Sequence, residues 1–318
     1  MPGTLTRDQL VSGILEFLGR QDDLLSHDQI RASLEHEIDA AGSSALAELK
    51  NQLTADDGWS YYPPCRLVAR IHYLLAGHFV RPESHVSGVE NLATVGDEPL
   101  ILCANHLSYA DANLIQILLY RAGFDELAGR LTALAGPKIF TSLERRFSSL
   151  CFGTIKVPQS TDVSSEEAVL GARDVARAAR QAIHAASQRL DVRDALVLFG
   201  EGRRSRTAQM QPMLPAVARY LEIQPDVWVL PVGITGTDAL FPVGDVRVRP
   251  ARIHLRIGTP LRAHHLLNVT NQHRQTMMDA IGLMIAELLP PSNRGAYENG
   301  GLLADAEQAL RRLRTVDC

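Results

Sequence analysis

His106 and Asp111 have the residue types and the spacing that acid–base chemistry needs. A neutral imidazole accepts a proton near pH 7, and a carboxylate bonded to its other ring nitrogen fixes the tautomer and stabilises the imidazolium. Such a pair can remove the proton from a substrate hydroxyl. The chain has 11 His and 36 acidic residues, so about one pair at this spacing is expected by chance. The spacing alone therefore does not establish a catalytic role.

The elements around this pair should place it at the end of a strand. Residues 100–104 are apolar and follow a turn signal at 96–99, which predicts a buried strand. Residues 114–120 have helical spacing, and Asp111 lies in the opening turn, where an acidic side chain suits the free N–H groups. We therefore expect the imidazole of His106 to be open to substrate, with the carboxylate behind it.

A second candidate site follows the strand predicted at 195–199. Residues 200–206 read G-E-G-R-R-S-R, so two glycines, a serine and three arginines lie together. Glycine lets backbone N–H groups approach a phosphate, and guanidinium groups bind it through paired hydrogen bonds. This stretch predicts an anion site. A dinucleotide-binding loop is excluded, because the third glycine is missing and Pro212 prevents a helix directly behind.

Composition limits the class of protein. The 318 residues suffice for one large domain or two smaller ones, with ordinary contents of hydrophobic (46%) and charged (21%) residues. The net charge of −4 does not favour nucleic-acid binding. The four cysteines form no CxxC pair, which indicates buried free thiols in a reducing compartment. We expect no signal peptide and no transmembrane helix.

The chain should begin with a small helical appendage over residues 1–58, followed by a main domain over 59–318. Capping boxes at Thr6-x-x-Gln9 and Ser26-x-x-Gln29 predict two helix starts in the appendage. Residues 59–82 combine aromatic residues with a basic amphipathic helix, which suits either the membrane interface or an ordinary core-facing helix.

One later strand, at residues 227–234, contains Pro231. A proline cannot donate to a neighbouring strand, so we expect this strand at a sheet edge or with a bulge.

Four stretches, in this order, resemble the glycerolipid acyltransferase family, of the lysophosphatidate or glycerol-3-phosphate acyltransferase type. Residues 105–111 (NHLSYAD) resemble its NHxSxxD signature, and residues 199–205 (FGEGRRS) are similar to its FPEGTRS block. The Leu-Pro-Val at 230–232 and the Ile-Gly-Thr-Pro at 257–260 are also typical of it. The resemblance covers roughly residues 80–295.

The resemblance implies an α/β fold with a central mixed, mostly parallel sheet flanked by helices. It implies His106 as general base on an acceptor hydroxyl, with Asp111 orienting it. No metal or cofactor is needed, because the pair makes the nucleophile and backbone N–H groups can hold the oxyanion. The predicted substrate-binding residues are Asn105, Ser108, Lys156, Glu201, Gly202, Arg203, Arg204 and Ser205.

The sequence departs from the family pattern at three positions. Gly200 replaces a proline, Arg203 replaces a threonine, and Gln159 stands where an arginine usually helps to hold phosphate. A neutral amide loses the charge-assisted part of that contact, on the order of 1–3 kcal/mol. Lys156, Lys138 or Arg203 could compensate.

These observations predict an O-acyltransferase at the cytoplasmic, inner face of a membrane. It would move a fatty acyl group from acyl-CoA or acyl carrier protein to a lysophospholipid hydroxyl, with 1-acylglycerol 3-phosphate as the first choice. Glycerol 3-phosphate, or a non-phosphate lipid or amine, are alternative acceptors. Two other classes stay open: a catalytically silent membrane-surface binding protein, and a thioesterase that needs no acceptor.

Overall fold

The computed structural model describes residues 5–19, 27–55, 58–158, 171–244, 247–299 and 303–316. The capping box at Ser26 and the departure at Gln159 lie outside these residues, so their predictions stay untested. Within them, no helix is both long and apolar enough to cross a membrane.

A mixed sheet organises the described chain, as the family resemblance implies. Its order is β1-β5-β4-β6-β3-β7-β8-β2, and β9 pairs with β7. Pairing is parallel from β5 through β7 and between β8 and β2, and antiparallel at β1–β5, β7–β8 and β7–β9. The strands are β1 (Tyr61–Tyr62), β2 (His85–Ser87), β3 (Leu100–Ala104), β4 (Leu131–Ala135), β5 (Gly153–Lys156), β6 (Ala195–Phe199), β7 (Trp228–Thr235), β8 (His254–Ile257) and β9 (Leu261–Arg262).

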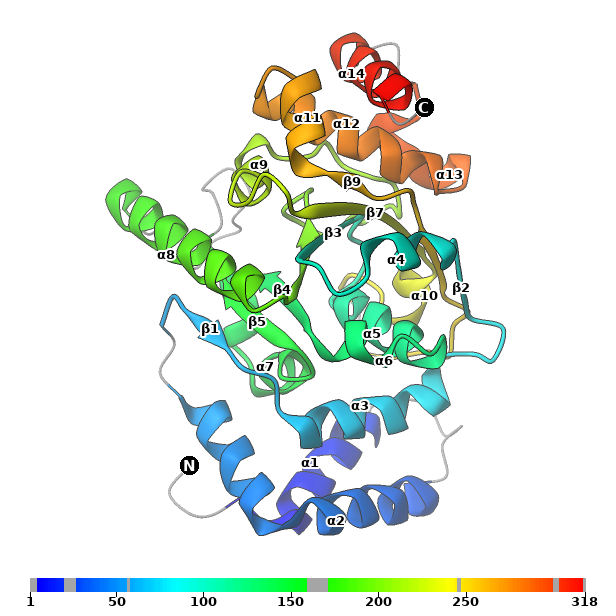
Figure 1. Cartoon of the computed structure of the whole chain (residues 1–318). Helices are drawn as coiled ribbons and strands as arrows, with labels where there is room; N and C mark the ends of the chain where they lie inside the picture. Colours follow the sequence, from blue (N-terminus) through cyan, green and yellow to red (C-terminus); the bar gives the residue numbers. More distant parts are fainter. Residues whose placement is uncertain are drawn as a thin grey trace.

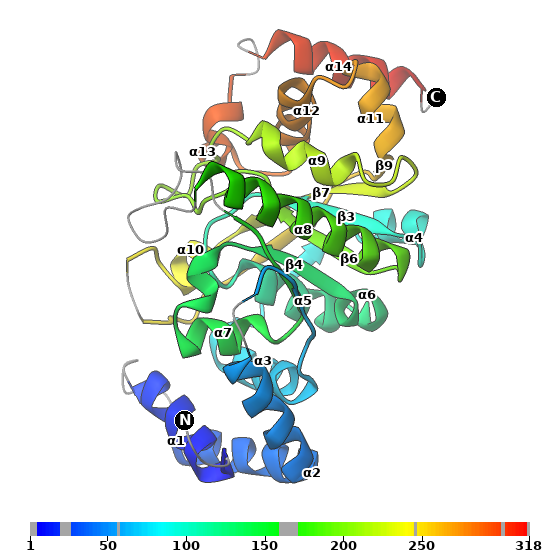
Figure 2. The same ribbon diagram turned by 90° about the vertical axis from the view of Figure 1, so that its left-hand side faces the viewer.

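Helices cover both faces of this sheet (Figures 1 and 2). The longer ones are α1 (Arg7–Gly19), α2 (His27–Thr54), α3 (Arg66–Phe79), α5 (Asp111–Arg121), α8 (Ala172–Asp191), α12 (Arg274–Glu287) and α14 (Ala304–Val316). The shorter ones are α4 (Glu90–Val95), α6 (Asp125–Gly129), α7 (Leu143–Ser149), α9 (Ala218–Leu221), α10 (Thr237–Leu240), α11 (Ala263–Val269) and α13 (Pro291–Arg294). Single 3₁₀ turns occupy Pro137–Phe140, Pro215–Val217 and Gly295–Tyr297.

The sheet separates two hydrophobic cores. Side chains alternate along a strand, so Leu100 and Leu102 of β3 face the core with α3 and α5, while Ile101 and Cys103 face the core with α8 and α12. All five residues of β3 are buried, as expected for a parallel strand covered on both sides. The chain leaves β3 toward β4 on one side, and β7 lies on the other, so the carboxyl end of β3 is a topological switch point where α/β proteins place ligands.

The expectation that Pro231 marks a sheet edge is wrong, but the alternative of an irregularity in the strand is supported: antiparallel pairing with β8 ends at Val232 and pairing with β9 resumes at Val229, one residue out of register. The strand that contains it, β7, lies between β3 and β8 in the interior of the sheet. The carbonyl of Pro231 accepts from the N–H of Gly258, one residue after β8 ends. The missing N–H of Pro231 therefore falls where no strand partner needs it.

The N-terminal helices α1 and α2 lie beside α3, on its side away from the sheet (Figure 1). The capping box before α1 is confirmed: the N–H of Gln9 donates to Oγ1 of Thr6 over 3.2 Å, and the N–H of Thr6 donates to Oε1 of Gln9 over 3.0 Å. Tyr61 and Tyr62 form the edge strand β1, which pairs with β5. They are half-buried and buried, respectively, so they do not form an exposed aromatic surface beside α3.

The cysteines of the described chain behave as buried hydrophobic residues. Cys65, Cys103 and Cys151 are free thiols with almost no exposure. Burial raises the pKa of Cys103 to about 12, so this thiol is unreactive at neutral pH.

Candidate active site

His106 lies just after β3, on the face of the sheet that packs against α3 and α5. Its ring stacks on that of Phe199, with centroids 4.2 Å apart and planes at 18°. Phe199 ends the neighbouring strand β6, so the parallel pairing of β3 and β6 brings the two rings together. The imidazole is 18% exposed and lines a large cavity. It is thus both held in place and open to a ligand.

Asp111 holds the imidazole from behind, as the spacing predicts. Nδ1 of His106 lies 2.8 Å from Oδ2 of Asp111. The same oxygen accepts hydrogen bonds from the N–H groups of Leu107 (2.7 Å) and Ser108 (2.9 Å). Because this oxygen acts as an acceptor, we assign the ring proton to Nδ1, which leaves the lone pair of Nε2 free. The arrangement can supply a general base at Nε2.

Glu201 joins the second motif to the first. It is 1% exposed, and its Oε1 accepts from the N–H of His106 over 2.8 Å, while Oε2 accepts from the N–H of Gln211 over 2.7 Å. The N–H of Ser205 donates in turn to the carbonyl of His106 over 2.8 Å. Burial raises the pKa of Glu201 to about 7, against the opposing effect of the two N–H donors. Glu201 and Ser205 therefore position the His106 backbone, and neither lines the cavity.

Asn105 and Ser108 have a similar positioning role. The side-chain amide of Asn105 bonds to both main-chain groups of Ile234, at 2.9 and 2.8 Å, and so continues the pairing of β3 with β7. The hydroxyl of Ser108 donates to the carbonyl of Phe241 over 3.0 Å. Both side chains are fully buried. The sequence predicted that both side chains bind substrate. In the structure they bond to the main chain instead and do not line the cavity.

The cavity beside His106 has a volume of about 1610 Å³. Its lining includes His106 as well as residues of the N-terminal helices α1 and α2. Its apolar wall includes Ile14, Phe17, Leu75, Phe79, Leu114, Ile117, Ile183 and Phe199. Its polar lining includes His106, Tyr109, Lys138, Arg145, Arg203, Arg204 and Arg206. A large, mostly apolar space with several cations in its wall fits an amphiphile that carries a negative charge.

Among the predicted binding residues, Gly202, Arg203 and Arg204 do line this cavity, but Lys156 does not. The side chain of Lys156 is buried, with its amino group 4.7 Å from the centroid of the Trp59 ring and 5.2 Å from that of Phe140. Thr154 and Lys156 are two residues apart in β5 and so face the same side of the sheet, but the amino group of Lys156 lies against Trp59 and Phe140 and does not line the cavity. Of the three side chains expected to compensate for the absent arginine, Lys138 and Arg203 line the cavity and Lys156 does not.

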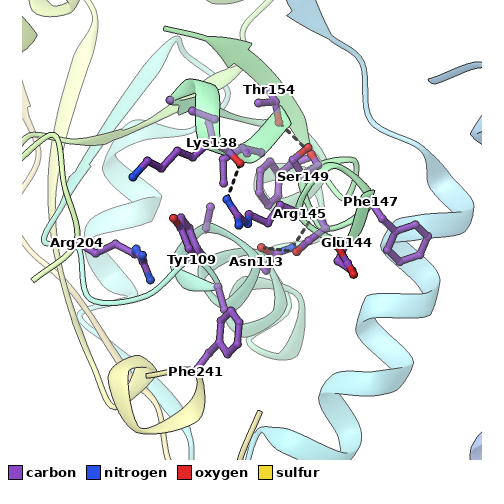
Figure 3. Close-up of a pocket in the computed structure, with 18 of the residues that line it drawn as sticks. Tyr109, Asn113, Lys138, Glu144, Arg145, Phe147, Ser149, Thr154, Arg204 and Phe241 are labelled. Carbon is purple, nitrogen blue, oxygen red and sulfur yellow. Dashed lines mark hydrogen bonds between the residues drawn. The ribbon is translucent and has the colours of Figure 1, made fainter. Parts of the chain in front are cut away.

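Two polar residues of the cavity, Tyr109 and Arg145, were not predicted from the sequence as binding residues. Figure 3 shows them with Arg204 and Lys138 around one part of the cavity. Tyr109 lies inside the first motif, so its place there was an available signal. Arg145 comes from α7, where nothing in the sequence distinguishes it from its neighbours, and only the fold brings it to the cavity.

The glycine loop is shaped by close packing. A Cβ atom on Gly200 would lie 2.4 Å from Sδ of Met213, so a larger residue there would require the Met213 side chain to move. Gly202 has φ of +67°, in the left-handed region where glycine is favoured. Elsewhere in the described chain, no three or more His, Cys, Asp or Glu side chains gather as metal ligands would.

Comparisons with known proteins agree with the first two motifs. Residues 83–235 match the family model described as Acyltransferase. No curated protein sequence matches the chain. Among solved structures, the chain is similar to the 1-acyl-sn-glycerophosphate acyltransferase PlsC from Thermotoga maritima, with 18% identity and a TM-score of 0.48. That similarity covers 89% of this chain and 98% of the other. At this identity and TM-score it carries no information about this protein's substrate.

Proposed function

We propose that this chain, whose residues 83–235 form an acyltransferase-family domain, is an O-acyltransferase for lysophospholipids. It transfers a fatty acyl group from the thioester of acyl-CoA or acyl carrier protein to the free hydroxyl of 1-acylglycerol 3-phosphate. The observation that carries the proposal is that the imidazole of the His106–Asp111 pair lines the same cavity as several cationic side chains and many apolar ones.

His106 acts first as base and then as acid. Its Nε2 takes the proton of the acceptor hydroxyl as the oxygen attacks the thioester carbonyl, which forms a new C–O bond. Asp111, 2.8 Å from Nδ1, stabilises the imidazolium that results. The tetrahedral intermediate then breaks its C–S bond, and the thiolate leaves with the proton that Nε2 returns. No net proton is gained or lost, and the products are an ester and a free thiol.

The cationic side chains of the cavity support a phosphate-bearing acceptor. Arg203, Arg204 and Arg206 line it from the glycine loop, and Arg145 and Lys138 line it from α7 and the turn before it. Guanidinium groups suit phosphate because they offer paired N–H donors. The apolar wall suits fatty acyl chains, since each buried CH₂ contributes about 0.8 kcal/mol.

The test is acyl transfer from labelled acyl-CoA to a panel of lysolipids by the purified protein. We expect thiol release that requires the acceptor, with 1-acylglycerol 3-phosphate preferred over lysophosphatidylcholine and glycerol 3-phosphate. The variant Arg204→Ala should raise the Michaelis constant for this acceptor. Thiol release without any acceptor would identify a thioesterase instead. No release at all, by either wild-type protein or His106→Ala, would identify a binding protein.

We also propose that the protein works at a membrane surface, since its acceptor resides in a bilayer. Two large apolar side chains support this: Tyr73 of α3 is 48% exposed and Leu143 of the adjoining helix α7 is 55% exposed. Replacing both by Ser should reduce sedimentation with anionic phospholipid vesicles. Val192→Ser is the matched control, because Val192 is equally exposed (59%) at the end of α8. Equal losses in both proteins would remove α3 and α7 from membrane contact.

A further inference from the structure

The ring of Tyr109 makes cation–π contacts with two arginines from different parts of the fold. The guanidinium carbon of Arg204, in the glycine loop, lies 3.4 Å from the ring centroid. That of Arg145, on α7, lies 5.4 Å from the same centroid. Figure 3 shows Tyr109 between the two side chains. Cation–π contact with Tyr109 therefore brings together charges that come from segments about sixty residues apart in the sequence.

Arg145 is held in place by the structure around it. Its Nη1 donates to the carbonyl of Lys138 over 2.8 Å, and its own N–H donates to Oγ of Ser142, which caps α7. The side chain of Lys138 extends toward the side of the cavity where Arg204 lies (Figure 3). The cavity wall thus presents Arg145 in one orientation before any ligand arrives.

Neither guanidinium group is in direct contact with a carboxylate in the part of the chain that the structure describes. Within the described residues, neither Arg145 nor Arg204 forms a salt bridge: the carboxylate of Asp111, which also attracts Arg204, is bonded to His106, and that of Glu144 points away from both (Figure 3). Burial lowers the pKa of Arg204, which reflects the cost of holding this charge away from water. A ring can fix a guanidinium without neutralising it, as a carboxylate would.

We propose that Tyr109 is a positioning residue that holds Arg204 and Arg145 as a pair for the phosphate monoester of the acceptor. The inference rests on the proposed function and deepens it, because it names the group recognised. Two guanidinium groups that form no salt bridge within the described residues match the dianion of a phosphate monoester. A phosphodiester headgroup carries one charge fewer and a bulky substituent, so it fits this pair less well. Arg145 is then the second phosphate ligand, in a place that the sequence motifs do not mark.

The test is a steady-state comparison of Tyr109→Leu, which removes the ring, with Tyr109→Phe, which keeps it. For Tyr109→Leu we expect the Michaelis constant for 1-acylglycerol 3-phosphate to rise about tenfold, with kcat and the Michaelis constant for acyl-CoA near wild type. Tyr109→Phe should restore most of the wild-type value. Arg145→Ala should resemble Tyr109→Leu, and Arg177→Ala, which removes an exposed arginine of α8, should change nothing.

Selectivity gives a second readout. The preference for 1-acylglycerol 3-phosphate over lysophosphatidylcholine, as a ratio of kcat/KM, should fall in both Tyr109→Leu and Arg145→Ala. A fall in kcat with an unchanged acceptor Michaelis constant in Tyr109→Leu would overturn the proposal. So would a Michaelis constant for the acceptor that is as high in Tyr109→Phe as in Tyr109→Leu.

Direct binding separates this inference from the proposed function. Glycerol 3-phosphate, titrated calorimetrically against each protein with glycerol as the neutral control, reports the phosphate site without any turnover. If the wild-type protein transfers no acyl group yet binds glycerol 3-phosphate about tenfold more tightly than Tyr109→Leu does, the proposed function fails and the site stands. If transfer occurs and binding does not depend on Tyr109 or Arg145, the site fails alone.

Discussion

The main-chain N–H of His106 donates to Oε1 of Glu201 over 2.8 Å, although the two residues are 95 positions apart. The other carboxylate oxygen of Glu201 accepts from the N–H of Gln211 over 2.7 Å. One buried side chain thus fixes the backbone of the candidate base and the far end of the glycine loop. The glycine loop, which we propose binds phosphate, and the strand end that carries His106 are therefore tied together by this side chain.

The first prediction concerns the pH dependence of stability at Glu201. Its pKa in the folded protein is about 7, against 4.5 in the unfolded chain, so the folded state binds more protons between these values. The contribution of Glu201 to stability is therefore fully present below about pH 4.5 and is lost as pH rises through 7. The free energy of unfolding of wild type minus that of Glu201→Gln should fall by about 3 kcal/mol between pH 4 and pH 8.

Urea unfolding at a series of pH values measures this difference. Glu98→Gln is the control, because its hydrogen bond to Arg262 lowers the pKa of that exposed carboxyl, and the corresponding difference should be small and rise with pH. A difference for Glu201 that is flat or rises with pH would mean that the carboxylate stays ionised in the folded protein.

The second prediction concerns Asp111→Asn. An amide group cannot accept from His106 Nδ1 and from the N–H groups of Leu107 and Ser108 as the carboxylate does. The imidazole loses both its tautomer and the charge that stabilises its protonated form. We expect kcat to fall about 10²- to 10⁴-fold with little change in the acceptor Michaelis constant.

The matched control for this variant is Asp125→Asn, which changes an exposed acidic residue in the first turn of α6. Its kcat should equal that of wild type. If Asp111→Asn retained more than about a tenth of wild-type kcat while folded by circular dichroism, His106 would not depend on Asp111 and the pair would be structural.

The sequence predicts the parts of this fold that local signals determine. The apolar runs of β3, β6 and β7 and the helix that begins at Asp111 follow from composition and periodicity within a few residues. The pairing of His106 with Asp111 was predictable because one residue follows the end of a predicted strand and the other lies in the first turn of the next predicted helix.

Other features depend on contacts that no local pattern contains. The positioning role of Glu201 depends on the backbone of His106. The burial of Lys156 depends on Trp59 and Phe140, which come from other segments of the chain and pack against its amino group. The place of Pro231 inside the sheet depends on where the next strand ends, and that of Arg145 depends on how α7 packs.

The third prediction concerns Gly236, which joins β7 to α10. It has φ of +90°, and a Cβ atom would lie 2.1 Å from the carbonyl oxygen of Arg252. Gly236→Ala should therefore cost about 1–2 kcal/mol in backbone strain and at least as much again in displaced backbone. Gly123→Ala is the control, because its φ of +83° is similar and nothing lies within 4 Å of the added atom.

Urea denaturation of both variants separates strain from steric conflict. We expect a loss of about 1 kcal/mol for Gly123→Ala and at least twice that for Gly236→Ala. The carbonyl of Phe241, just after α10, accepts from Ser108, so a displaced α10 should also reduce acyl transfer. Equal losses of stability in the two variants would show that the backbone around Arg252 moves away from the added Cβ atom without a loss of folding free energy.

The fourth prediction concerns the ion pair that fixes α8 to the sheet. Arg189 donates to both carboxylate oxygens of Asp194, at 2.7 and 3.0 Å, and the hydroxyl of Thr132 donates to the same carboxylate over 2.6 Å. Asp194 is buried while Arg189 is 27% exposed, so Asp194→Ala should cost about 2–3 kcal/mol, less than for a fully buried pair. Asp174→Ala breaks only an exposed pair with Arg177 and should change stability by less than about 0.5 kcal/mol. Thermal and urea unfolding measure both, and equal effects would mean that solvent screens the Arg189 pair as fully as the exposed one.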